Sequence, residues 1–264
     1  MARNETPFLP LLDSEPQSPN ASPSAALTAP TVPHVPTTPQ ATRPGALLFP
    51  QVFARLSQQA TSGLTLFTGA GRTSALALPF AAMFTARGET VAVVEAANNF
   101  NLYRLTEWAR RNGMAPLELL NRLRIARSFT PFQLAVILEH IGKEMTRYGA
   151  TRLVVTGLPD CLYDEELTEL EARNTFARCR QSLARLAAQA TVLSFAEAPP
   201  HAVGGRARFQ EMLLGLARTA FEVHAGEPVS FVPVFAPIRA PGLLTVSHTE
   251  LGYNVPQRRQ AHGH

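Results

Sequence analysis

Residues 64–74 of this 264-residue chain read LTLFTGAGRTS. The mainly apolar residues 64–67 predict a short buried strand, and the apolar periodicity from about residue 74 to 87 predicts a helix that Gly88 ends. A glycine-rich turn between a strand and a helix is a common phosphate-binding position, because the start of the helix offers free backbone N–H groups and a partial positive charge. The turn is therefore the first candidate site, for a nucleotide or another anion: Gly69, Ala70, Gly71, Arg72, Thr73 and Ser74.

On the C-terminal side of this turn, apolar strands alternate with helices. The expected strands lie at residues 90–95, 123–126, 151–156 and 191–196, and the longer helices between them at 102–112, 131–148 and 165–189. Strands that are apolar on both faces and separated by long helices predict a mostly parallel sheet covered by helices on both sides. Two late strands, at 221–224 and 229–235, lie close together in sequence and predict an antiparallel C-terminal edge.

Three regions differ in composition. Residues 1–46 are rich in proline and are expected to form a disordered tail, because proline lacks the N–H group that helices and sheets need. Residues 47–247 should form the core domain, and residues 248–264 a flexible C-terminal tail. A small apolar cluster within the first tail, formed by Phe8, Leu11 and Leu12, is a candidate docking peptide for a protein partner; the alternative is an ordinary solvated tail.

The overall composition limits the classes of function. Hydrophobic residues make up 45% of the chain and charged residues 17%, and a formal net charge of +4 permits nucleic-acid binding without establishing it. The sequence contains no apolar run of roughly 18 residues and no apolar core of a secretory signal, so we expect a cytoplasmic protein with no membrane partner. Cys161 and Cys179 match no zinc-binding or redox spacing and are expected to be small core residues.

Further segments follow the glycine-rich turn in order. They are VVEAANNF at 93–100 with Arg104-Leu105 behind it, LRIARSFT at 123–130, LVV at 153–155 leading to Leu162-Tyr163, the helix through residues 172–187, and Gly204-Gly205. Together with the turn, they resemble the RecA superfamily, particularly the archaeal RadA and eukaryotic recombinase branch and its paralogues, from about residue 47 to 247. The resemblance implies a three-layer RecA-like P-loop fold and a role in DNA recombination or repair.

The resemblance also implies where the residues for ATP hydrolysis should stand, and three of those positions are changed. The P-loop pattern G-x-x-x-x-G-K-S/T has a lysine where this chain has Arg72, and the loop is about two residues short of that pattern. Ala97 occupies the position of the glutamate that positions water, with Glu95 as a displaced alternative. Gly157 occupies the position of the Walker B aspartate that orients Mg²⁺, with Asp160 as a shifted alternative. We therefore expect a pseudo-ATPase with no catalytic residue.

Residues 69–74 are then expected to form an anion site without a catalyst. No cofactor is expected, although backbone N–H groups suffice for weak ATP or Mg²⁺ binding, which stays open. The competing interpretation is that Arg72 pairs with a nearby carboxylate at the start of the helix.

Two arginines are candidate contacts to DNA phosphates. Arg206 and Arg208 follow Gly204-Gly205, which in the family comes after the second DNA-binding loop. The alternative interpretation is that both belong to the solvated start of a helix.

The sequence as a whole predicts a non-catalytic RecA-like accessory protein of DNA recombination or repair. It would act through a protein partner, namely a recombinase, a repair factor or a second copy of itself, and DNA is a further candidate partner. Two alternatives stay open: a divergent nucleotide-binding ATPase with slow hydrolysis, and a RecA-like regulatory inhibitor of a partner protein. A fold does not choose among them.

Overall fold

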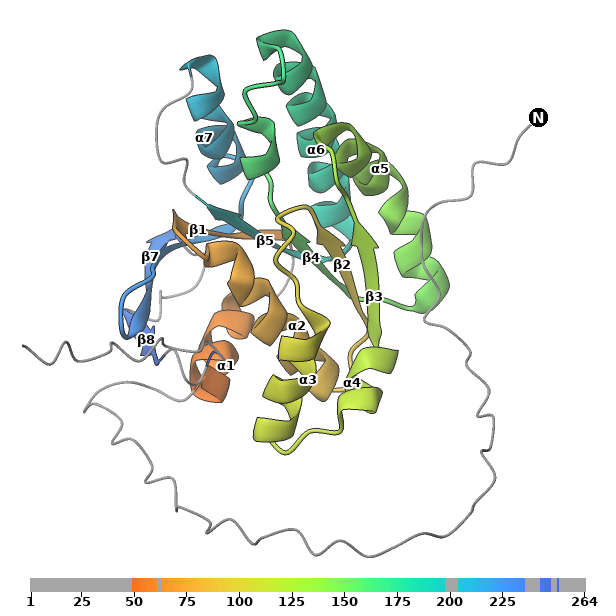
Figure 1. Ribbon diagram of the computed structural model, residues 1–264, viewed down its shortest axis with the longest axis vertical. Coiled ribbons are helices and arrows are strands. Elements are labelled where there is room, and N and C mark those ends of the chain that lie inside the picture. The colour runs from red at the N-terminus through yellow and green to blue at the C-terminus, as the bar shows by residue number, and fades with distance from the viewer. Residues whose placement is uncertain (1–48, 61–62, 198–203, 236–242, 248–250, 252–264) are drawn as a thin grey trace, which may run out of the picture.

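The computed structural model describes residues 49–60, 63–197, 204–235, 243–247 and 251. Within them, eight strands form one sheet in the order β3-β2-β4-β5-β1-β6-β7-β8 (Figure 1). The strands are β1 (Gly63–Ala70), β2 (Val91–Glu95), β3 (Leu123–Arg127), β4 (Arg152–Thr156), β5 (Thr191–Glu197), β6 (Thr219–His224), β7 (Val229–Phe235) and β8 (Leu244–Val246).

The pairing of these strands confirms the predicted sheet. All pairs from β3 across to β6 are parallel, whereas β6 with β7 and β7 with β8 are antiparallel. The sequence predicted the parallel strands and the antiparallel edge but not the short strand β8. The predicted tails lie outside the described residues apart from Leu251, and so do Phe8, Leu11 and Leu12 of the candidate docking peptide.

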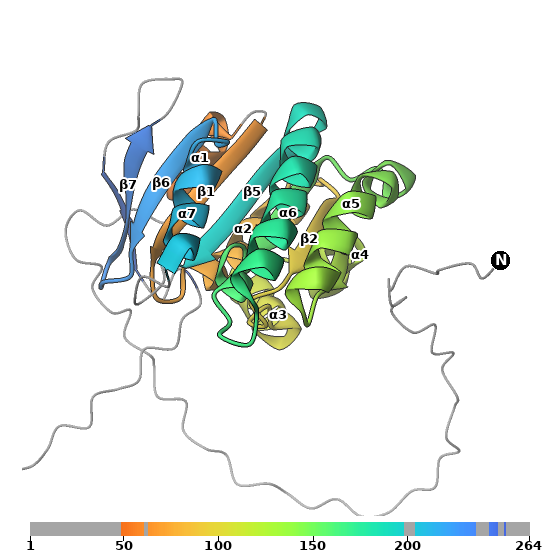
Figure 2. The ribbon, with the colours of Figure 1, turned by 90° about the horizontal axis from the view of Figure 1, so that it is seen from above.

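Helices cover both faces of the sheet, which gives three layers (Figures 1 and 2). One face carries α1 (Phe49–Gln59), α2 (Ala77–Ala86), α3 (Leu102–Arg111) and α4 (Pro116–Asn121). The other face carries α5 (Pro131–Tyr148), α6 (Glu169–Gln189) and α7 (Arg208–Leu214). Three short 3₁₀ helices, η1 (Thr73–Leu76), η2 (Asp160–Leu162) and η3 (Gly204–Ala207), follow β1, β4 and β5 in the chain.

Aromatic rings fill the core under α1 and α2. Phe67 on β1 stacks on Phe195 of β5 with ring centroids 4.7 Å apart, and Phe80 of α2 meets Phe67 at 5.1 Å. Phe49 and Phe53 of α1 close this cluster against Phe80. Ring pairs at these separations add to the free energy gained by burying the rings, so this core fixes β1, and the turn that follows it, against α2.

The path of the chain changes faces at the carboxyl ends of β1 and β5. After β1 the chain turns to the face that carries α2, whereas the helix that follows β5 lies on the opposite face (Figures 1 and 2). In open α/β sheets, ligands bind where neighbouring strands send their connections to opposite faces. The ends of β1 and β5, which pair in register from Gly63 with Thr191 to Gly69 with Glu197, are such a point.

Candidate functional site

The glycine-rich turn is tighter than a phosphate-binding loop. β1 extends to Ala70 and η1 begins at Thr73, so only Gly71 and Arg72 connect them. Both have positive φ angles, 63° and 65°. A Cβ atom on Gly69 would lie 2.0 Å from the carbonyl oxygen of Val223 on β6, so this glycine is required by the close approach of β6. The two glycines therefore have backbone reasons to be there that involve no ligand.

A small hollow lies beside this turn. Its volume is about 180 Å³, and its lining is mostly apolar, with Leu76, Val223 and Val229 opposite Arg72 and Thr73. Ligand pockets usually measure roughly 300–1,000 Å³. The hydroxyl of Thr73 is buried and has no hydrogen-bond partner. The hollow is thus too small for a nucleoside triphosphate but retains one unused polar group.

Polar side chains from separate segments meet along the carboxyl ends of the strands. The Ser74 hydroxyl donates to Glu197 Oε1 at 2.5 Å, and Asn99 Nδ2 donates to Ser74 Oγ at 2.5 Å. The backbone N–H of Asn99 donates to Glu95 Oε1 at 2.8 Å, and Arg127 Nε lies 3.3 Å from Glu95 Oε2. We call Glu197, Ser74, Asn99, Glu95 and Arg127 the carboxyl-edge chain. It joins β5, η1, the turn after β2, and β3.

Asp160 extends this chain on the side of β4. Both of its carboxylate oxygens accept the backbone N–H of Glu197, each at 3.1 Å. Burial, the largest cause, and the charge of Glu197 raise the pKa of Asp160, the bond from the Glu197 backbone lowers it, and the result is a pKa of about 7. Near neutral pH both the protonated and the ionised form of this carboxyl group are therefore populated.

The two positions named as lost catalytic residues lie against each other. Gly157 has a φ of 77°, and a Cβ atom there would lie 2.5 Å from the carbonyl carbon of Ala96 and from the nitrogen of Ala97. Real Cβ atoms do not approach backbone that closely. No carboxylate can therefore stand at position 157 unless the turn after β2 moves.

The displaced alternatives are also engaged within the fold. Glu95 is 1% exposed and is held by Arg127 and by the Asn99 N–H group. Asp160 is held by the Glu197 N–H group.

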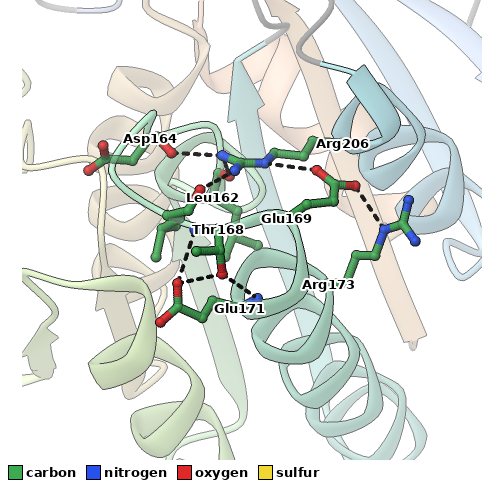
Figure 3. Close-up of polar contacts among 8 residues, drawn as sticks. Leu162, Asp164, Thr168, Glu169, Glu171, Arg173 and Arg206 are labelled. Atoms are coloured by element: carbon green, nitrogen blue, oxygen red, sulfur yellow. Dashed lines mark hydrogen bonds and ion pairs between the residues drawn. The ribbon is translucent and has the colours of Figure 1, made fainter.

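Arg206 is a correction to the prediction of a DNA contact. Its side chain is only 7% exposed, and its guanidinium lies among the carbonyl oxygens of Leu162, Asp164 and Leu167 and the carboxylate of Glu169 (Figure 3). All of these acceptors belong to the chain itself, so the guanidinium is not available to a phosphate. Arg208, at the first position of α7, is exposed and stays a candidate.

The loop that Arg206 holds connects β4 to α6. Glu169 also accepts from Arg173 Nε at 2.8 Å, so one carboxylate links two arginines (Figure 3). The same loop ends in a capping box, in which Thr168 and Glu171 exchange hydrogen bonds. The part of this segment that leads into α6 is thus held by Arg206 and by the capping box.

Sequence reasoning missed Asn99 and Glu197 as members of the site. Asn99 stands in a polar turn after a buried strand, and Glu197 follows the apolar run of β5. Polar residues that end buried parallel strands meet at one edge of the sheet, so this position was the available signal.

The chain matches no protein-family model and no curated protein. What the structure establishes is an α/β protein with a mostly parallel sheet between two helical layers. No helix among the described residues is long and apolar enough to cross a membrane. In the same residues, no three histidine, cysteine or acidic side chains form a metal-ligand group.

Proposed function

We propose that this chain is a non-catalytic RecA-like accessory protein of DNA recombination or repair. The observation that carries the proposal is the carboxyl-edge chain. A P-loop enzyme needs open backbone N–H groups, a lysine and a metal-binding aspartate. This chain has a two-residue turn at that place. The adjoining carboxyl edge is closed by hydrogen bonds among the chain's own residues.

The charge at this edge also opposes ATP. Glu95, Asp160 and Glu197 are three acidic side chains at this edge, and Arg127 pairs with Glu95. A triphosphate would approach this group against like charge in a partly buried setting, where electrostatic repulsion is weakly screened. Loss of nucleotide binding is therefore favoured over slow hydrolysis.

The surface beside β3 favours a protein partner. Among the described residues β3 pairs only with β2, so its outer edge is open. Phe129, Phe132 and Val136 lie just beyond it and are 75%, 43% and 44% exposed. Open strand edges with apolar neighbours are sites at which proteins add a strand or a hydrophobic contact. A recombinase, a repair factor or a second copy of this chain would be the partner, and the cluster of Phe8, Leu11 and Leu12 is the proposed reciprocal peptide.

The decisive experiment is capture of partners by the tagged full chain from its native host. We expect a recombinase or a repair factor to be recovered, and Phe129→Ser combined with Phe132→Ser to abolish the recovery. A variant with Leu170→Ser, which changes an equally exposed apolar residue elsewhere, is the matched control. Recovery of proteins with no link to DNA metabolism would contradict the proposal.

A slow ATPase is the second candidate, because the buried Thr73 hydroxyl is unused and lies beside the hollow at the turn. ATP with Mg²⁺ should then raise the melting temperature, and Arg72→Ala should abolish hydrolysis. We expect neither effect.

A further inference from the structure

Arginine side chains gather where β2 and β3 begin. Arg87 lies in the connection that leads into β2, and Arg122 and Arg124 lie at the start of β3; the first two are exposed and Arg124 is half-buried. Two hydrogen bonds join these segments, because the Val91 N–H donates to the Arg122 carbonyl oxygen at 2.9 Å and Arg122 Nη1 donates to the Gly88 carbonyl oxygen at 2.7 Å. We call Arg87, Arg122 and Arg124 the arginine face.

The partners of these arginines are uncharged. The Arg87 guanidinium lies 4.6 Å from the ring centroid of Phe53, and the Arg124 guanidinium lies 4.9 Å from that of Tyr148. In the part of the chain that the structure describes, no carboxylate forms an ion pair with the arginine face. An aromatic ring or a carbonyl oxygen orients a guanidinium but leaves its charge in place. The face therefore holds positive charges near one another, and an anionic partner would relieve their repulsion.

The opposite end of the sheet presents acidic side chains. Asp164, Glu165 and Glu166 follow one another in the loop from β4 to α6, and all are exposed. Within the described residues, no basic side chain forms an ion pair with them. Arg206 holds the backbone of this loop through the Asp164 carbonyl oxygen at 2.7 Å and leaves the Asp164 carboxylate unpaired. We call residues 164–166 the acidic loop.

The two charged groups point away from each other within one molecule. Because β2, β3 and β4 are parallel, they all begin at one edge of the sheet and end at the other. The arginine face lies at the first edge and the acidic loop follows the second. A single chain therefore cannot bring them together, whereas two copies placed end to end can.

We propose that the arginine face of one copy binds the acidic loop of a second copy. Guanidinium and carboxylate groups match in charge and in hydrogen-bond geometry, and both groups are already held in place, by aromatic rings on one side and by Arg206 on the other. Each contact leaves one arginine face and one acidic loop unused, so the association is head-to-tail and open-ended. It involves neither the turn after β1 nor the residues that follow β3, so the inference does not rest on the proposed function.

The test is sedimentation velocity of the full chain over a range of protein concentrations, at about 50 mM and about 500 mM NaCl. At the lower salt concentration we expect oligomers that grow with protein concentration. At the higher one we expect monomers, because salt screens contacts between exposed charges. Arg87→Gln with Arg122→Gln, and separately Glu165→Gln with Glu166→Gln, should each weaken association by more than about tenfold.

Mixing these two neutralised variants separates a head-to-tail contact from a general loss of charge. One variant keeps its acidic loop and the other keeps its arginine face, so the mixture should form dimers and nothing larger. Dimers in the mixture also show that both variants are folded. Arg178→Gln with Arg180→Gln, which changes exposed arginines on α6, is the matched control and should associate as the unaltered chain does. Phe129→Ser with Phe132→Ser should also keep this association, which distinguishes it from the partner surface beside β3.

The proposal is overturned if the unaltered chain is monomeric at both salt concentrations, if its oligomers persist at the higher one, or if the mixture of variants stays monomeric. It is also overturned if the monomeric chain binds a DNA oligonucleotide and Arg87→Gln with Arg122→Gln abolishes that binding, because the arginine face would then serve a nucleic acid.

Discussion

Replacing Arg206 by alanine tests whether this residue is internal support or a DNA contact. The guanidinium contacts Glu169 Oε2 at 3.2 Å, the Leu162 carbonyl oxygen at 3.2 Å and the Asp164 carbonyl oxygen at 2.7 Å, and it also contacts the Leu167 carbonyl oxygen. The Glu169 side chain is 42% exposed, so water can replace its contact with Arg206, and this ion pair contributes little to stability. The carbonyl oxygens of Leu162 and Leu167 face a buried group and would lose a charged donor.

The expected loss follows from these contacts. A buried acceptor left without a donor costs about 1–3 kcal/mol, and breaking a buried charged network costs about 3–5 kcal/mol in total. We therefore expect Arg206→Ala to lower the free energy of unfolding by about 3–5 kcal/mol. With a urea m-value of about 2.5 kcal/mol/M, the unfolding midpoint falls by about 1–2 M.

The assay is urea unfolding followed by circular dichroism, with Arg208→Ala as the matched control. Arg208 is exposed and lies two residues further along, so its removal should change stability by less than about 0.5 kcal/mol. Equal midpoints for the two variants, or a loss below about 1 kcal/mol for Arg206→Ala, would refute the internal role. If DNA binds at all, Arg208→Ala should weaken binding and flatten its salt dependence while the protein stays folded.

Three further predictions concern the core and the carboxyl edge. The pKa of Asp160 is about 7 in the folded chain and 3.8 for the free group, so this carboxyl group ionises at lower pH in the unfolded chain. The free energy of unfolding should therefore fall as pH rises from about 4 to 7, by up to about 4 kcal/mol. Asp160→Asn should remove this fall, which is measured as the difference between urea midpoints at about pH 5 and pH 8 in the presence of a chelator. Asp164 is exposed, and Asp164→Asn should keep the fall. Gly157→Asp should destabilise the fold and not create Mg-ATP binding, as thermal melting with and without Mg-ATP would reveal. Phe80→Ala should cost about 3–5 kcal/mol in urea unfolding, because its ring is 1% exposed and touches several others.

The layers of the fold were predictable because strands such as β2 and β5 carry apolar runs and the long helices between them have clear boundaries. Gly149, for example, ends α5 in a left-handed conformation, as a glycine after a helix usually does. The start of α6 was predicted four residues early, at 165, because the capping box of Thr168 and Glu171 was not recognised.

The candidate site was predictable only in part. The sequence predicted the glycine-rich turn between β1 and η1 at 69–74, whereas the interpretation of Ala97 and Gly157 as replaced catalytic residues stays a prediction. It could not identify the carboxyl-edge chain, because Ser74 meets Glu197 across 123 residues and Asn99 across 25. The two arginines after Gly204-Gly205 could not be told apart from their spacing. Arg206 points inward because its guanidinium donates to carbonyl oxygens of a loop about 40 residues earlier in the chain.

The contact between Gly157 and the turn at 96–97 limits which substitutions this part of the chain tolerates. A Cβ atom at 157 would meet the backbone of that turn at 2.5 Å. Position 157 can therefore accept a side chain only if the turn after β2 shifts, so the two turns can change only together.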